Sequence, residues 1–193
     1  MLLGAGAFAL SACDEPVDLT FFSDVGQCKA AAAESSEFSE GDCERSFEQA
    51  LAEHAVLAPR YTERALCEEQ HGEGACGPSQ AAGGLPDPTT EEAPQGATGP
   101  SFMPFFMGYM IGNMLSSNRP GGYVGRPVYR DAQGQFFSSD GRRFGFAGPG
   151  AQVRGTAAQV RPPELTRVAA PMTRAAVSAR GGFGAARAPS FGG

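Results

Sequence analysis

Tryptophan is absent from the 193 residues of this chain, and aromatic residues make up only 9% of it. Glycine and proline are plentiful instead, with 27 and 15 residues. A chain with few large, rigid side chains and many residues that interrupt helices and strands buries little apolar surface. We therefore predict a small ordered part and a large disordered fraction.

Histidine is nearly absent as well, which limits the chemistry open to the chain. Only His54 and His71 occur, and the sequence has no nucleophile elbow, phosphate-binding loop or paired-carboxylate motif. General acid–base catalysis requires a positioned histidine or a carboxylate with a shifted pKa. We interpret His54 as a packed core residue. We predict no catalytic residue and no cofactor, and therefore a protein that is not an enzyme.

A zinc site is the alternative that the cysteines leave open, because Cys67, His71, Glu73 and Cys76 lie close enough in sequence to supply four ligands. This spacing contains no Cys-x-x-Cys pair, and an oxidising compartment joins such thiols as a disulfide. A histidine at the end of a helix also interacts favourably with the helix dipole. We therefore predict no metal site.

Charge is missing from residues 1–12, which are all apolar or small, whereas Cys13 is followed by Asp14 and Glu15. This switch is typical of the apolar region of a signal peptide that meets its cleavage site. The stretch Leu10-Ser11-Ala12-Cys13 resembles the bacterial lipobox, in which a small residue precedes a lipid-modified cysteine. We predict a signal peptide over residues 1–12 and lipidation of Cys13. Because no basic stretch precedes the apolar region, we expect this signal peptide to be truncated.

The predicted lipid indicates where the protein is located. Twelve apolar residues are too few to cross a bilayer, which takes roughly 20 in a helix, but several acyl chains hold a domain on a membrane. We expect a periplasm-facing lipoprotein of the bacterial cell envelope, with the membrane as a partner through the N-terminal lipid. Asp14 and Glu15 resemble the acidic signal that retains lipoproteins in the inner membrane, so the inner membrane is favoured over the outer.

Four further cysteines, Cys28, Cys43, Cys67 and Cys76, fall within 49 residues. An even number in an exported chain predicts two disulfides. Three pairings exist, and sequence proximity favours Cys28–Cys43 and Cys67–Cys76. Each short loop closed in this way stabilises the fold by about 2–3 kcal/mol in the chain-entropy model.

Local patterns predict the secondary structure around these cysteines. Alternating residues predict a short strand over 17–22, and an apolar stripe predicts a helix over 43–57 whose Glu44, Glu48 and Glu53 face water. A second helix is predicted over 63–71, where Gly72 ends it. We predict a small α+β fold, in which residues 13–77 form a lipid-anchored, disulfide-stapled domain of two to three helices with one strand.

Residues 78–100 are rich in proline, glycine and acidic residues, which predicts a disordered acidic linker. Residues 101–118 then turn apolar, and the spacing of Gly108 and Gly112 favours a closely packed helix. The stretch is too short to span a bilayer. It is covered either by its own domain, by the membrane interface, or by an envelope protein or second copy that binds 102–115. We favour the last, with Phe105, Phe106, Gly108 and Gly112 as interaction residues.

The C-terminal part has the opposite charge from the rest. Residues 1–118 carry 18 acids and 4 bases, whereas residues 119–193 carry 3 acids and 11 bases. A hairpin is predicted over 119–147, around the turn at 131–134, and an arginine-rich disordered tail over 148–193. The asymmetry indicates either a basic tail that folds back over an acidic domain or a tail that binds a polyanion. Export leaves no nucleic acid as its partner.

Several motifs in order resemble one known family. They are the lipobox, the strand, Cys28 and Cys43, Ala58-Pro59-Arg60-Tyr61, Cys67, Gly72-Glu73-Gly74-Ala75-Cys76, the apolar run Ser101 to Gly112, and Arg180-Gly181-Gly182-Phe183-Gly184. Together they are similar to the YgiB-like family of uncharacterised bacterial envelope lipoproteins (domain of unknown function 1190). The resemblance implies an envelope address and no substrate. We expect a non-enzymatic structural or interaction component at the membrane, and as the alternative a module that binds anionic lipid or wall polymer through the arginine-rich tail.

Overall fold

The computed structural model describes residues 16–79, 101–114, 122–161, 163–165, 168 and 170–180. The predicted signal peptide, Cys13, most of the acidic linker and the end of the tail lie outside these described residues. The strands are β1 (Pro16–Phe22), β2 (Cys76–Pro78), β3 (Phe102–Pro104), β4 (Tyr109–Met114), β5 (Gly122–Arg130), β6 (Phe136–Ser138), β7 (Arg143–Phe144) and β8 (Gln152–Thr156). The helices are α1 (Val25–Glu34), α2 (Glu40–Leu57), α3 (Arg64–His71), α4 (Ala157–Val160) and α5 (Arg174–Ala179).

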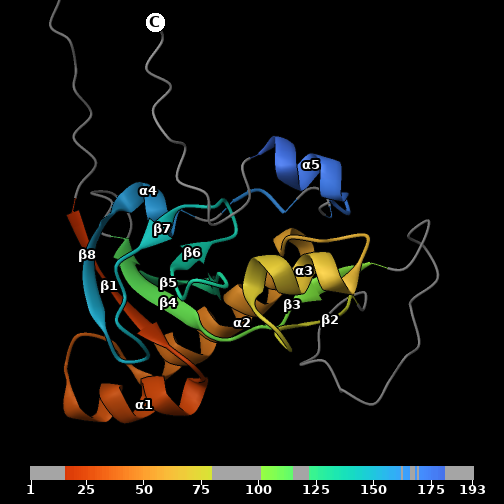
Figure 1. Ribbon diagram of the computed structural model, residues 1–193. Coiled ribbons are helices and arrows are strands. Elements are labelled where there is room, and N and C mark those ends of the chain that lie inside the picture. The colour runs from red at the N-terminus through yellow and green to blue at the C-terminus, as the bar shows by residue number, and fades with distance from the viewer. Residues whose placement is uncertain are drawn as a thin grey trace, which may run out of the picture.

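The prediction of a small helical domain with one strand and a later hairpin is wrong. The described chain is built on a six-stranded sheet in the order β7-β6-β5-β4-β1-β8, with β2 and β3 as a separate small sheet. All neighbours in the larger sheet pair antiparallel. The sheet curls strongly, so that β8 and β7 at its two ends approach the same side of the molecule (Figure 1).

The apolar stretch predicted as a helix over 101–118 forms β3 and β4 instead. Met110 packs into the cluster on one face of the sheet, whereas Tyr109 and Ile111 pack into the cluster on the other face. A strand covered on both faces is apolar at successive positions, which in sequence resembles a buried helix. Gly108 has φ +140°, and a Cβ there would collide with the backbone oxygen of Phe22, so the glycine is needed where β4 begins beside β1.

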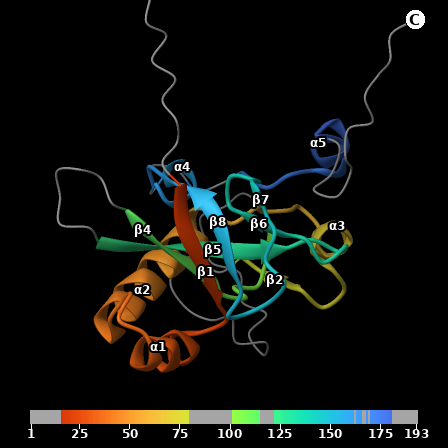
Figure 2. The same ribbon diagram turned by 90° about the vertical axis from the view of Figure 1, so that its left-hand side faces the viewer.

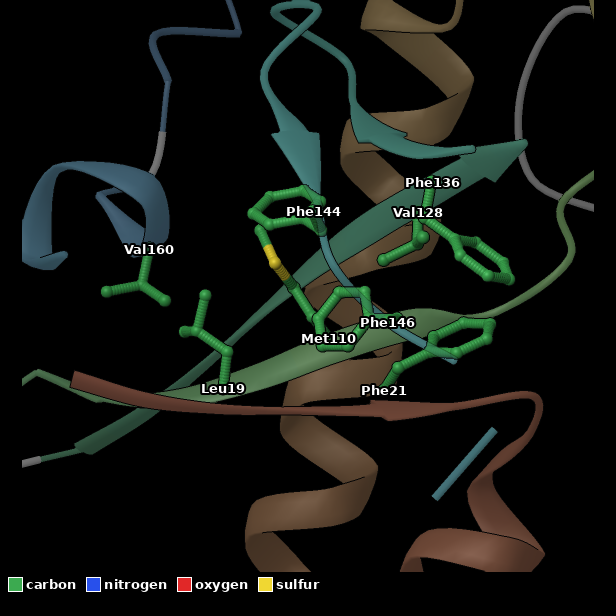
Figure 3. Packing of buried hydrophobic residues seen from close by; sticks show 8 residues of the cluster. All are labelled: Leu19, Phe21, Met110, Val128, Phe136, Phe144, Phe146 and Val160. Atoms are coloured by element: carbon green, nitrogen blue, oxygen red, sulfur yellow. The ribbon is translucent and has the colours of Figure 1, made fainter. Parts of the chain in front are cut away.

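The inner face of the curled sheet is covered by side chains of its own strands together with Phe146 and, from α4, Val160. Its cluster contains Leu19, Phe21, Met110, Val128, Phe136, Phe144, Phe146 and Val160. In Figure 3 these side chains point into one space, with α2 on the opposite side of the sheet. Aromatic pairs such as Phe21 and Phe136, with ring centroids 5.2 Å apart, fill much of it.

Helices α1 and α2 cover the outer face of the sheet (Figure 2). The predicted helix over 43–57 begins three residues earlier, because Ser39 and Asp42 form a reciprocal capping box. The structure contains the disulfides Cys28–Cys43, which ties α1 to α2, and Cys67–Cys76, which ties α3 to β2. In the described part of the chain, no helix has the length and apolarity needed to cross a membrane.

The tail predicted as disordered over 148–193 is ordered in part. Residues 152–156 form β8, which pairs with β1, and two short helices, α4 and α5, follow. Three ion pairs join the acidic and basic parts of the chain: Arg126–Glu53, Arg154–Asp18 and Arg174–Glu69. The described part of the basic segment therefore folds back over the acidic domain, as the first interpretation of the charge asymmetry predicts. Binding of a polyanion by the tail stays a prediction.

The hairpin predicted over 119–147 is present as β5 and β6, and β7 extends it. The carboxylate of Asp131 accepts hydrogen bonds from the backbone N–H groups of Gln133 and Gln135, which fixes the turn. A lone hairpin is only marginally stable, but β5 also pairs with β4 from Gly122 to Pro127.

Candidate functional site

His71 is the centre of a buried polar cluster where α3 ends against β5. Its Nδ1 lies 3.1 Å from the backbone oxygen of Arg130, and its Nε2 lies 2.8 Å from the hydroxyl of Tyr61. A carbonyl oxygen only accepts hydrogen bonds, so Nδ1 carries the proton and Nε2 accepts the hydrogen bond that Tyr61 donates. The two neighbours thus fix one neutral tautomer of His71.

Burial keeps this cluster uncharged. It lowers the pKa of His71 to about 4 and raises the pKa of Tyr61, so at neutral pH the imidazole stays unprotonated and the phenol stays protonated. Arg130 and Asp131 oppose the shift at His71 without cancelling it. A general base works best with a pKa near the working pH, and neither group has one.

A solvent-open hollow of about 300 Å³ lies beside His71. It is lined by His71, Gly72, Glu73, Ala75, Met107, Arg130, Asp131 and Ala132. The disulfide Cys67–Cys76 closes the loop that supplies one wall. The hollow has the volume of the smallest ligand pockets and offers both a carboxylate and a guanidinium.

His54 forms a second tyrosine–histidine pair on α2. Its Nδ1 lies 3.1 Å from the hydroxyl of Tyr129, and the two rings stack with centroids 5.7 Å apart. Burial, with a smaller effect of the charge on Arg60, lowers the pKa of His54 to about 4. Arg60 itself donates to the backbone oxygen of Ala55 near the end of α2, where the helix dipole favours a cation. The interpretation of His54 as a packed core residue agrees with this burial.

The charged centre of the fold is the buried pair of Glu53 and Arg126. Arg126 Nη2 lies 2.7 Å from Glu53 Oε1, and Nε lies 2.9 Å from Oε2. The guanidinium also donates to Ser139 Oγ at 3.0 Å and to the backbone oxygens of Gln159 and Arg161. Every nitrogen of Arg126 therefore has an acceptor, and one side chain connects α2, β5, the turn after β6 and α4.

The prediction that Glu53 faces water is wrong. The helical pattern placed it on the water-facing side of α2, but its side chain is only 5% exposed. From the sequence, Glu53 was predicted only as a water-facing residue, and no role was predicted for Arg126. An arginine inside a run that otherwise reads as a strand is the signal that indicates a buried ion pair, although the sequence does not name its partner.

The predicted disulfide and interaction residues lie inside the domain, whereas the predicted lipidation site, Cys13, lies outside the described residues. Cys67 and Cys76 are bonded to each other and supply no thiolate, and the described residues hold no group of three or more potential metal ligands. Phe106 packs edge-on against Phe47, and Gly112 faces Leu19 across the sheet. Phe105 lies against Gly77. A partner for 102–115 stays a prediction, since the residues proposed to bind it already contact their own chain.

Comparison with known proteins gives a family but no activity. A family model described as "Protein of unknown function (DUF1190)" matches residues 16–191. A UPF0441 protein of Erwinia tasmaniensis is 28% identical over 185 residues, which cover 93% of this chain and 76% of the relative. No solved structure matches the chain.

Proposed function

Because the chain belongs to the DUF1190 family, whose description assigns no activity, we propose a function from its own residues. It is a lipid-anchored, non-enzymatic domain of the bacterial cell envelope that acts as a structural or interaction component at the membrane.

The two disulfides carry this proposal. All four cysteines are completely buried, and each bond joins two elements of the fold. Reducing systems keep such thiols unpaired in the cytosol of most bacteria, whereas the periplasm oxidises them. A fold built around two buried disulfides therefore supports an address outside the cytoplasm.

The position of β1 supports the anchor. This strand begins at Pro16, three residues after Cys13. Three extended residues span about 10 Å, so a lipid on Cys13 would hold the start of β1, an interior strand of the six-stranded sheet, close to the bilayer. Asp14 and Glu15 fill this short connection and are the reason to favour the inner membrane, with the domain facing the periplasm.

The state of the buried polar groups supports a non-enzymatic role. The pKa of each histidine is lowered to about 4 by burial, and the hydrogen-bonding groups of Arg126 are satisfied within the fold. These groups stabilise the structure, and none is poised to exchange a proton at neutral pH.

The test is Cys13→Ser in the native host. We expect a larger, unprocessed precursor without lipid, because acylation of the thiol precedes cleavage, and mass spectrometry of the membrane fraction measures both changes. Ser11→Ala is the matched control, since it keeps a small residue before the cysteine and should be processed normally. An unchanged mature mass in the Cys13 variant would refute the anchor.

A further inference from the structure

Two large hydrophobic side chains are exposed on the described part of the chain, and they lie three positions apart in the sequence. Leu165 is 46% exposed and Val168 is 60% exposed. Both belong to the segment that joins α4 to α5. A single exposed leucine needs no explanation, but these two residues lie among arginines in the sequence.

The segment is attached to the fold at both ends. At its start, Arg126 Nη1 donates to the backbone oxygens of Gln159 and Arg161. At its far end, the backbone N–H of Met172 donates to the oxygen of Arg60 at 2.7 Å. We call the segment between α4 and α5, residues 161–173, the strap. Hydrogen bonds hold both of its ends, and the two exposed side chains lie between them.

The helices that flank the strap, α4 and α5, lie on the side of the molecule where the described chain begins. In both Figure 1 and Figure 2, the start of β1, α4 and α5 lie at the top, and α1 lies at the opposite end. The views differ by a turn about the vertical axis, so this shared side does not result from overlap. Cys13 precedes the first residue of β1 by three positions.

The charge of residues 161–180, which include the strap and α5, complements an anionic surface. Residues 161–180 contain four arginines and one glutamate, a net charge of +3. Within the described residues, Arg161 and Arg180 form no ion pair, whereas Arg174 is bound by Glu69. Glu164 is the single acid of the segment and weakens this charge without reversing it. Nearby Arg154 has only a loose, exposed pair with Asp18 at 3.7 Å.

We infer that Leu165 and Val168, together with Arg161 and Arg180, form a docking surface for an anionic phospholipid bilayer, into which the two apolar side chains insert while the two arginines bind headgroup phosphates. The inference rests on the proposed anchor at Cys13, which brings this side of the domain to the membrane. Apolar side chains flanked by arginines suit the boundary between headgroups and acyl chains. Each contact contributes little affinity alone. The lipid anchor keeps the surface at a high effective concentration near the bilayer, so that the contacts act together.

The absence of tryptophan from the natural chain permits a clean test. Leu165→Trp places a single fluorescent reporter on the surface, and the full protein purified from membranes is reconstituted into phosphatidylcholine vesicles with or without phosphatidylglycerol. We expect a blue-shifted emission and several-fold stronger quenching by brominated acyl chains in the anionic vesicles. Ala33→Trp is the control, because this exposed residue lies on α1 at the opposite end and should not be quenched.

A charge-removing variant sharpens the test. Adding Arg161→Gln and Arg180→Gln to the Leu165 reporter should reduce the quenching to the level seen in neutral vesicles, while circular dichroism remains unchanged. Quenching that is equal in neutral and anionic vesicles would overturn the assignment to anionic lipid. Reporter quenching no greater than that of the Ala33 control would overturn the docking surface.

The two proposals fail separately. If Cys13 proves to carry lipid but the Leu165 reporter stays unquenched, the anchor stands and the docking surface is wrong. If Cys13 carries no lipid but anionic vesicles quench the reporter, the docking surface stands and the anchor is wrong.

Discussion

The Glu53–Arg126 pair and the Tyr61–His71 pair are both buried, but the first is charged and the second is neutral. Burying charge is costly unless every hydrogen bond is made, and Arg126 makes its bonds to three separate parts of the fold: α2, the turn after β6, and the end of α4. The neutral pair needs only the two hydrogen bonds of His71. Because these bonds do not enclose the imidazole on every side, His71 also lines an open hollow at the end of α3. The charged pair fixes the arrangement of the elements, whereas the neutral pair leaves a surface accessible.

The largest expected effect comes from breaking the charged pair. Arg126→Met would leave the carboxylate of Glu53 buried without its partner, so we expect the free energy of unfolding to fall by about 3–5 kcal/mol. Urea unfolding followed by far-UV circular dichroism measures this change.

The double variant Glu53→Leu with Arg126→Met is the control for that experiment. It removes both charges and keeps apolar volume, so it should recover most of the lost stability. A double variant no more stable than the single one would show that lost packing, and not the unpaired carboxylate, causes the damage.

Acid should weaken the neutral pair. The pKa of His71 is lowered to about 4 in the folded state, against an ordinary value of 6.5. The unfolded chain therefore binds more protons between these values, and stability that is present above pH 6.5 is lost as the pH falls toward 4. Between pH 7.5 and 5 we expect a loss of about 2 kcal/mol from His71.

Comparison of variants at the two pH values checks this assignment. His71→Gln should lose its share of the pH dependence, and His54→Gln should lose a similar share, because the pKa of His54 is lowered to about 4 as well. A pH dependence that both variants retain in full would place the acid sensitivity on other groups.

Removing one hydroxyl should have a smaller effect. Tyr61→Phe leaves Nε2 of His71 without a donor in a buried place, which we expect to cost about 1–2 kcal/mol. Tyr129→Phe is the matched variant, since it removes the hydroxyl that contacts His54. Thermal unfolding measures both, and a melting temperature unchanged by Tyr61→Phe would argue against the hydrogen bond.

The smallest effect is expected at the surface. Arg174 and Glu69 form a bidentate pair with distances of 2.7 and 2.8 Å, and about half of each side chain is exposed. Water already solvates both groups, so Arg174→Gln should change the melting temperature least of all these variants. The difference should disappear at high salt, and a loss as large as that of Arg126→Met would contradict the role assigned to burial.

Local periodicity predicted part of this fold well. The alternation over 17–22 corresponds to β1, and the apolar stripe over 43–57 corresponds to most of α2. Short loops made the disulfide pairing evident, and the family was identified from its ordered motifs. These features depend on residues that are near one another in sequence.

The errors concern contacts between distant segments. β4 is apolar on both sides because α2 covers one face and the curled sheet covers the other, so its sequence lacks the usual alternation. β8 contains mostly polar and small residues and is ordered through its pairing with β1. Glu53 and Arg126 lie 73 positions apart, and no local pattern connects them.

The place of β1 in the sheet determines when the fold can be completed. This first strand lies between β4 and β8, and its Asp18 pairs with Arg154 near the other end of the chain. A ribosome or a translocation pore releases β1 long before β4 and β8. Until these two strands emerge, both edges of β1 lack a partner strand. Closure of the sheet is therefore a late event that follows synthesis of nearly the whole polypeptide, and long-range pairing of this kind makes folding slow.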